Sequence, residues 1–291
     1  MSDPSALDGA MNDGSALRAP VAARRRIQRG AAVLLAAGLL IGSAACSSDD
    51  AASESTTTTA PDPGDGGTGG GGDLDAYCDA SVALDQIFQS IDPEDAEGFA
   101  AALDDAAPIV ADLEAAAPAE LHEHVAVLVA SFGKVKESGD ASAFETEEVD
   151  AADAAAHEFD LANCDLTKVA VTAGDFHFTG DLPTEAGRVS IEMTNEGAEP
   201  HLMIVARKKD DVDGSAQAAF EAIEGEEDFP KSFDQMVSIW TAPGDSDYGM
   251  GELTPGEYVA FCPIPVGSTA DGEGDGPPHF AQGMVETFTV A

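Results

Sequence analysis

The stretch Leu253-Thr-Pro-Gly-Glu-Tyr-Val-Ala-Phe-Cys262 predicts a turn followed by a β-strand that ends on a cysteine. Proline and glycine favour the turn, and the aromatic and β-branched residues after them favour the strand. Similar runs recur beyond Leu166, at Val169–Val171, Val189–Met193 and Phe288–Val290. We therefore expect a β-sandwich in this half of the chain, with a helical insertion between strands at about 213–225.

Two further stretches carry side chains that could meet Cys262. His279-Phe-Ala-Gln-Gly-Met284 lies downstream, and Asn195-Glu-Gly-Ala-Glu-Pro-His201 joins two predicted strands upstream. One thiolate, two imidazoles and one thioether are the ligands of a blue-copper site, in which two histidines and a cysteine form a plane and methionine is a weak axial ligand. Sulfur suits Cu(I) and imidazole suits both oxidation states. These residues therefore fit a one-electron carrier.

The segment 169–291 resembles the cupredoxins, the plastocyanin and azurin superfamily of Greek-key β-sandwiches. Three elements occur in the same order: N-x-G-x-x-P-H ending at His201, L-x-P-G-x-Y-x-x-x-C ending at Cys262, and H-x-x-x-x-M from His279 to Met284. The resemblance implies a type 1 copper ion held by these two histidines, the cysteine and the axial methionine, for electron transfer or copper handling. The mature chain as a whole is similar to uncharacterised lipoproteins of high-GC Gram-positive bacteria, which implies no activity.

The spacing of the last two elements departs from this pattern. Electron-transfer cupredoxins join their cysteine and second histidine by a short loop, whereas 16 residues separate Cys262 from His279. A longer loop adds little closure entropy, so His279 could still return to the site. The alternative is a fold retained without metal, in which Cys262 and Met284 belong to the core and hydrogen bonds satisfy the histidines. The protein would then be a non-metal scaffold or binding lipoprotein at the cell surface.

Residues 74–165 are rich in Ala, Glu and Asp, with apolar residues at helical spacing, and predict a domain of four helices. Cys78 and Cys164 lie near the two ends of this segment, where antiparallel helices could bring them together, and disulfides are natural outside the cytosol. Closing a loop of 85 residues would stabilise the fold by about 4–5 kcal/mol in the chain-entropy model. The predicted fold class is thus multidomain: a disulfide-stapled α-helical domain followed by a cupredoxin-like β-sandwich at 166–291.

Residues 1–45 have the order of a signal peptide. Five arginines precede an apolar run, Ala31–Gly42, and small residues then lead into Cys46. The run has 12 residues, fewer than the roughly 20 that span a bilayer. A cysteine after such a sequence resembles the lipobox of bacterial lipoproteins, which implies that Cys46 is lipidated at the extracytoplasmic face of the cell membrane. Plain secretion is the alternative, and both the Sec and the twin-arginine export routes stay open.

Residues 46–73 predict a flexible linker because, beyond Cys46, they are almost entirely Ser, Thr, Asp, Gly, Pro and Ala. The linker should span about 30 Å as a Gly/Ser-type coil. Removing residues 1–45 takes away five of 13 basic and three of 55 acidic residues, which leaves a formal charge of −44. Such a polyanion repels nucleic acid and anionic lipids. We therefore expect membrane contact through the lipid alone, and any redox partner to be basic.

The sequence contains none of the common catalytic motifs, neither a G-x-S-x-G elbow, nor H-E-x-x-H, nor a P-loop. We therefore predict that the protein is not an enzyme, with a copper oxidoreductase as the alternative. Trp240 and Phe261 are expected in the sandwich core. His157 lies in a predicted helix rich in acidic residues and is expected at the surface.

Overall fold

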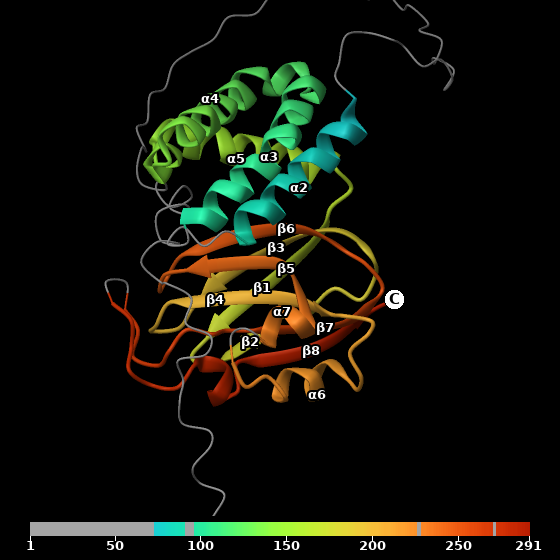
Figure 1. Cartoon of the computed structure of the whole chain (residues 1–291), viewed down its shortest axis with the longest axis vertical. Helices are drawn as coiled ribbons and strands as arrows, with labels where there is room; N and C mark the ends of the chain where they lie inside the picture. The colour runs from blue at the N-terminus through green and yellow to red at the C-terminus, as the bar shows by residue number, and fades with distance from the viewer. Residues whose placement is uncertain (1–72, 91–95, 226–227, 270–271) are drawn as a thin grey trace, which may run out of the picture. The chain divides into compact units, whose positions relative to one another are not determined.

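The computed structural model describes residues 73–90, 96–225, 228–269 and 272–291 (Figure 1). The predicted signal peptide, the lipidation site Cys46 and all of the predicted linker except Asp73 lie outside these residues. Within the described ranges, no helix is both long and apolar enough to cross a membrane.

Four α-helices occupy the described part of the segment that was predicted to be helical. They are α2 (Leu74–Ser90), α3 (Ala96–Ala116), α4 (His122–Ser138) and α5 (Glu147–Asn163), with short 3-10 turns η1 (Ala119–Leu121) and η2 (Ala141–Phe144). Local signals set their ends. The hydroxyl of Thr146 accepts a hydrogen bond from the N–H of Val149 at the start of α5, and Gly139 ends α4 in the left-handed conformation.

The predicted disulfide between Cys78 and Cys164 is confirmed. Cys78 lies in α2 and Cys164 directly follows α5, and their Cα atoms are 5.3 Å apart. Both side chains are buried. The bond therefore joins the first and last helices of this segment, 86 residues apart in the sequence.

Two four-stranded sheets follow, with strand orders β2-β1-β3-β6 and β5-β4-β7-β8. The strands are β1 (Thr167–Gly174), β2 (His177–Thr179), β3 (Gly187–Asn195), β4 (His201–Lys208), β5 (Phe233–Thr241), β6 (Ser246–Leu253), β7 (Gly256–Phe261) and β8 (Val285–Val290). All strand pairs are antiparallel except β1 with β3. The predicted order of a helical segment followed by a two-sheet sandwich is confirmed.

The sandwich core forms between the two sheets. In β1 the side chains of Val169, Val171 and Ala173 alternate with more exposed neighbours, so one face of the strand points inward. In β4 the first six residues are all buried, because this strand lies between β5 and β7. Trp240 and Phe261 are buried as predicted.

A helical insertion lies between β4 and β5, as expected for residues 213–225. It contains α6 (Ala216–Glu221) and is followed by α7 (Phe229–Ser232). The hydroxyl of Ser215 caps α6 by accepting from the N–H of Ala218. The ring of Phe220 packs against Phe261 at the end of β7, with ring centroids 4.8 Å apart.

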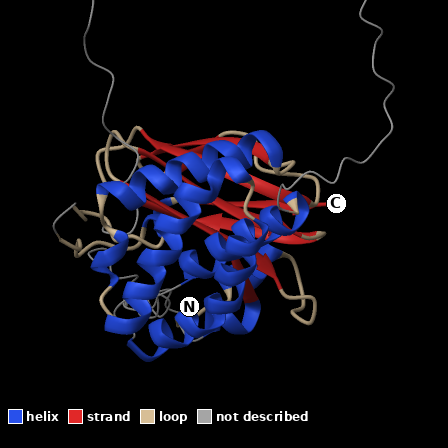
Figure 2. Cartoon of the chain, turned by 90° about the horizontal axis from the view of Figure 1, so that it is seen from above, coloured by secondary structure: helices blue, strands red, loops and turns tan. Residues whose placement is uncertain are grey.

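Helix α2 covers the corner where the two sheets meet, and Figure 2 shows helices in front of the strands when this part of the chain is seen from above. β5 and β6 are edge strands of opposite sheets. Gln89 bridges them, because its Oε1 accepts from the N–H of Ser238 (2.5 Å) and its Nε2 donates to the carbonyl of Met250 (3.1 Å). The helix thereby supplies hydrogen-bond partners to two edges that have no neighbouring strand on that side.

The prediction that His157 lies at the surface is wrong. Its ring stacks on Tyr248 of β6, with centroids 3.3 Å apart, and its Nε2 lies 3.1 Å from the hydroxyl of Ser190. The acidic residues of α5 suggested exposure, but His157 lies on the side of this helix that meets the sandwich, and so does Asp153, which accepts from the hydroxyl of Tyr248.

Candidate metal centre

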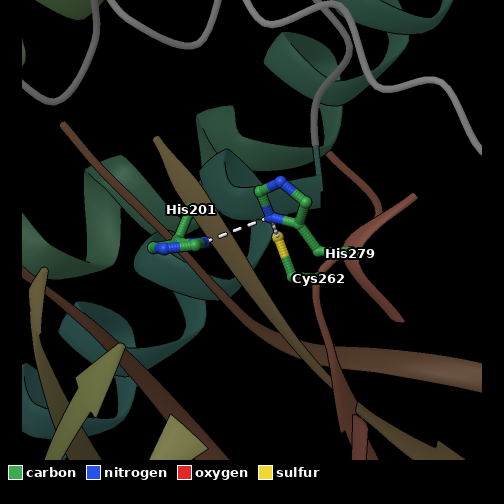
Figure 3. A group of neighbouring side chains, drawn as sticks. All are labelled: His201, Cys262 and His279. Atoms are coloured by element: carbon green, nitrogen blue, oxygen red, sulfur yellow. Dashed lines mark hydrogen bonds between the residues drawn. The ribbon is translucent and has the colours of Figure 1, made fainter. Parts of the chain in front are cut away.

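The predicted ligands come from separate strands that meet at one end of the sandwich. His201 begins β4, and Cys262 directly follows β7, its hydrogen-bonded neighbour. His279 opens the short 3-10 helix η4 (His279–Gln282), and Met284 lies between η4 and β8. Residues 78 positions apart in the chain are thus brought together (Figure 3).

Three donor atoms converge in this place. Nδ1 of His201 lies 3.2 Å from Nδ1 of His279, and Sγ of Cys262 lies 3.4 Å from the same His279 nitrogen (Figure 3). The ligand atoms of these three residues all lie within 4.8 Å of one another, and none of the side chains is exposed to solvent. A single metal ion placed between these atoms could bind all three of them.

The N-x-G-x-x-P-H element positions His201. The amide of Asn195 donates to the carbonyls of Glu199 (2.9 Å) and Thr241 (3.2 Å), and its oxygen accepts from the N–H of Gly197 (2.8 Å). One buried amide thus holds the loop in front of His201 against the end of β5. A Cβ on Gly197 would lie 2.7 Å from Nε2 of His201, so glycine is required where the loop passes the ring.

The element that ends at Cys262 is held by a tyrosine corner. The hydroxyl of Tyr258 donates to the carbonyl of Thr254 (2.7 Å) and accepts from the N–H of the same residue (3.0 Å). This fixes the turn from which β7 starts. At the other end of β7, Sγ of Cys262 accepts a hydrogen bond from the N–H of Leu202 on β4 at 3.4 Å.

The long loop between Cys262 and His279 closes close to the site. The N–H of His279 donates to the carbonyl of Ile264 (2.8 Å), and the N–H of Val266 donates to that of Pro277 (2.9 Å). Further out, the buried hydroxyl of Ser268 accepts from the N–H of Gly274 (2.9 Å). Backbone pairing therefore begins two residues after Cys262, and the extra length projects from the site without separating its ligands.

Met284 is tied by its backbone to both neighbouring ligands. Its carbonyl accepts from the N–H of Cys262 (3.1 Å), and its N–H donates to the carbonyl of His279 (3.1 Å). Its side chain is fully buried. Gly283, with φ of 110°, makes the turn that returns the chain to this position. The role of the thioether as the axial ligand stays a prediction.

Glu199 is part of the site, and the sequence reasoning missed it. Its Oε2 lies 3.0 Å from Nε2 of His279 and accepts from the N–H of Gly267 at 2.8 Å. Because a carboxylate only accepts, Nε2 of His279 carries the proton and Nδ1 keeps its lone pair toward the centre. The signal for this role was a carboxylate two residues before a predicted ligand, which alone is too common to be informative.

Burial sets the protonation of the three donors. It lowers the pKa of His201 to about 4, with a smaller contribution from His279, and it also lowers the pKa of His279 despite the opposing effect of Glu199. Both imidazoles are therefore neutral at physiological pH and able to bind a metal. Burial raises the pKa of Cys262 to about 12, so the thiol must release a proton when a metal binds.

The donor set fits copper. A cysteine sulfur and two imidazole nitrogens meet in a dry site; thiolate sulfur suits Cu(I), and imidazole suits copper in both oxidation states. Nε2 of His201 is buried and has no hydrogen-bond partner among the described residues, so its ring is held by packing and by the contact at Nδ1. The four residues His201, Cys262, His279 and Met284 are arranged like a type 1 copper site.

The two sheets and this site are those expected of a cupredoxin-like domain behind a helical segment. No family model and no curated protein matches the chain. Among solved structures it is similar to dithionite-reduced auracyanin from Roseiflexus castenholzii, at 20% identity over 43% of this chain and 97% of that one, with a TM-score of 0.29. Auracyanin A from Chloroflexus aurantiacus, described as a "blue" copper protein, shares 18% identity over 43% and 100% of the two chains, with a TM-score of 0.28. Amicyanin from Paracoccus versutus shares 19% over 44% and 87%, with a TM-score of 0.23.

Proposed function

We propose that this protein is a membrane-tethered, extracytoplasmic cupredoxin that binds one copper ion and transfers single electrons. The observation that carries the proposal is the meeting of Nδ1 of His201, Nδ1 of His279 and Sγ of Cys262 inside a buried site. Met284 would complete the ligand set from the same loop end. Bound copper would supply a one-electron couple between Cu(I) and Cu(II).

The chain's own residues hold the donors in place and keep water out. Cys262 and His201 sit on paired strands, and His279 is fixed by backbone bonds to Ile264 and by the bond from Nε2 to Glu199. The ring of Phe176 packs edge-on against His279 at 5.0 Å between centroids. Such a frame would resist movement of the ligands between two oxidation states, and a small reorganisation favours rapid electron transfer.

The support for the tether comes from the sequence, and the disulfide is consistent with it. The residue order before Cys46 favours lipidation there, and the acidic surface opposes direct binding to anionic lipid. The Cys78–Cys164 disulfide is compatible with an oxidising compartment. A redox partner of this polyanion would present a basic surface.

Addition of Cu(II) to the purified protein tests the copper site. We expect one equivalent to bind and to produce the intense visible band of a thiolate–Cu(II) bond, which Cys262→Ser abolishes. His122→Gln is the matched control, because His122 is an exposed histidine at the start of α4, outside the metal centre, and should leave the band unchanged. A protein that stays colourless, or copper affinity that is the same in Cys262→Ser, would overturn the proposal in favour of a non-metal binding lipoprotein.

Redox cycling separates electron transfer from copper handling. Ascorbate should bleach the band and a mild oxidant should restore it over repeated cycles, with the copper retained throughout. Copper handling instead predicts that Cu(I) leaves to a competing chelator after the first reduction.

Fractionation of producing cells tests the anchor. The protein should occur with membranes, carry an acylated N-terminal Cys46 by mass spectrometry, and appear in the medium as the Cys46→Ser variant. A wild-type protein found only in the medium or in the cytoplasm would contradict the tether and leave the copper proposal untouched.

A further inference from the structure

A cavity whose lining includes none of the predicted metal ligands lies between the helices and strand β6. Its volume is about 250 Å³. Most of its wall is apolar and comes from the helices, including Leu84, Val110, Leu113, Val125, Val129 and Phe132. A volume above the roughly 150 Å³ that accommodates benzene gives room for an aromatic ring with a short side chain.

Five carboxyl groups line the rest of this cavity: Asp85, Asp150, Asp153, Asp160 and Asp247. Three of them accept hydrogen bonds from residues on other elements of the fold. The N–H of Met250 donates to Asp85, the hydroxyl of Tyr248 donates to Asp153 (2.8 Å), and the hydroxyl of Ser81 donates to Asp160 (2.6 Å).

Asp247 differs from these three. Its Oδ1 accepts from the N–H of Tyr248 (2.8 Å), but its Oδ2 is buried and has no hydrogen-bond partner among the described residues. A buried acceptor without a donor costs about 1–3 kcal/mol. An unpaired carboxylate oxygen in a cavity wall therefore indicates a donor that comes from a ligand.

No lysine or arginine occurs among the described residues that line this cavity. Its histidine, His157, has a pKa lowered to about 4 by burial and is neutral. Burial raises the pKa of Asp85 to about 7, that of Asp160 to about 6 and that of Asp247 well above its usual range, so these carboxyl groups tend to hold protons that a bound cation would displace. The cavity thus combines several carboxyl groups with an apolar wall, and no positively charged side chain occurs in its described lining.

A bare metal ion does not fit this arrangement. Such an ion needs three or more ligand atoms that converge, and the one group of this kind among the described residues is His201, Cys262 and His279. The carboxyl groups of this cavity are spread along its wall instead. A metal would also leave the apolar part of the cavity unfilled.

We propose that the cavity between the helices and β6 binds a small organic cation, an ammonium group carried on an apolar body. The ammonium would lie beside Tyr248, which donates hydrogen bonds to both Asp153 and Asp247, and the apolar body would lie against the helical wall around Phe132. This proposal is independent of copper and gives the helical segment a function of its own.

Calorimetric titration of the whole protein with 2-phenylethylamine hydrochloride tests the proposal. The uncharged 2-phenylethanol is the matched probe because it has the same ring and chain length. We expect the amine to bind about 10- to 100-fold more tightly than the alcohol, the ratio that a hydrogen bond to a charged group provides. Cys262→Ser should bind the amine as wild type does.

Substitutions locate the charge that recognises the amine. Asp247→Asn and Asp153→Asn should each weaken amine binding by about 10-fold or more while leaving the alcohol unchanged, since asparagine keeps a similar shape. Asp112→Asn, an exposed position outside the cavity, should bind as wild type. Two aspartate variants are used so that a folding defect in one, seen by circular dichroism, leaves the other as the test.

Three results would overturn the proposal. Equal binding of the amine and the alcohol would show an apolar cavity that ignores charge. Binding of neither probe would exclude this class of ligand, and unchanged amine binding in both aspartate variants would place the amine elsewhere.

Discussion

Glu199 accepts a hydrogen bond from Nε2 of His279, the ring nitrogen that faces away from the metal centre, at 3.0 Å from its Oε2. The same oxygen accepts from the N–H of Gly267 in the long loop. One carboxylate thus orients a ligand and fastens the loop that delivers it. A hydrogen-bonded carboxylate also increases the basicity of the imidazole at its other nitrogen.

Glu199→Gln should therefore weaken copper binding by about 10- to 100-fold, because the amide removes the charge while keeping one acceptor. Competition with a chelator of known affinity measures the change. Glu196→Gln, at an exposed position in the same loop, should be without effect. Equal affinities in Glu199→Gln and wild type would mean that packing alone orients His279.

Gly249→Ala should destabilise the protein by about 1–3 kcal/mol through overpacking under α2. A Cβ at this position of β6 would lie 2.9 Å from Val237, 3.0 Å from Ile239 and 3.2 Å from Nε2 of Gln89. Gly133→Ala is the control, since it lies inside α4 with nothing within 4 Å of the added carbon, and should stabilise by about 0.5–1 kcal/mol. Urea unfolding compares the two, and a neutral Gly249→Ala would show that α2 can shift away from the strand.

The stability of the folded chain should fall as the pH rises from about 4 to about 7 because of Asp85. The pKa of this carboxyl is raised by burial to about 7 in the folded state, so the folded state holds a proton that the unfolded state has already lost. The favourable contribution is complete below the ordinary pKa of an aspartate and is lost as the pH passes the raised one.

Asp85→Asn isolates this effect, because the asparagine oxygen can still accept from the N–H of Met250. Unfolding midpoints of variant and wild type should differ most above pH of about 7 and converge below about 4, with the variant the more stable at the higher pH. A constant difference across that range would contradict the shift. Asp160, whose pKa is raised to about 6, contributes with the same sign in both proteins.

Loss of the disulfide should destabilise the helical segment by about 2–5 kcal/mol. The double variant Cys78→Ser and Cys164→Ser removes both buried sulfurs that join α2 to the end of α5. Far-ultraviolet circular dichroism during urea unfolding measures the loss, and the copper band reports on the sandwich separately. An unchanged midpoint would mean that packing alone holds the two helices together.

The predicted ligands His201 and Cys262 could be found because each lies at the end of a strand, next to a short motif with a mostly local backbone pattern. The turn before Tyr258, the strand ending at Cys262 and the amide of Asn195 before His201 all act within a few residues of their own positions. The disulfide was predicted from the positions of Cys78 and Cys164 near the two ends of the helical segment. These features need no knowledge of the distant packing.

The parts that sequence reasoning missed depend on distant segments. Glu199 acquires its role only when the long loop folds back to His279 and Gly267. His157 is stacked on Tyr248, 91 positions away, which no helical pattern around it reveals. The cavity beside β6 likewise joins side chains of α2 and α5 to Asp247, so it exists only in the folded chain.

The bridge that Gln89 makes between β5 and β6 also bears on self-association. Unpaired strand edges are the places where sandwich proteins join one another into aggregates. Together with Asp85 and Gln86 of the same helix, Gln89 gives hydrogen-bond partners to an edge strand of each sheet. The helical segment therefore protects two sheet edges from self-association. A shorter chain that begins after Asn163 should expose both edges and aggregate more readily.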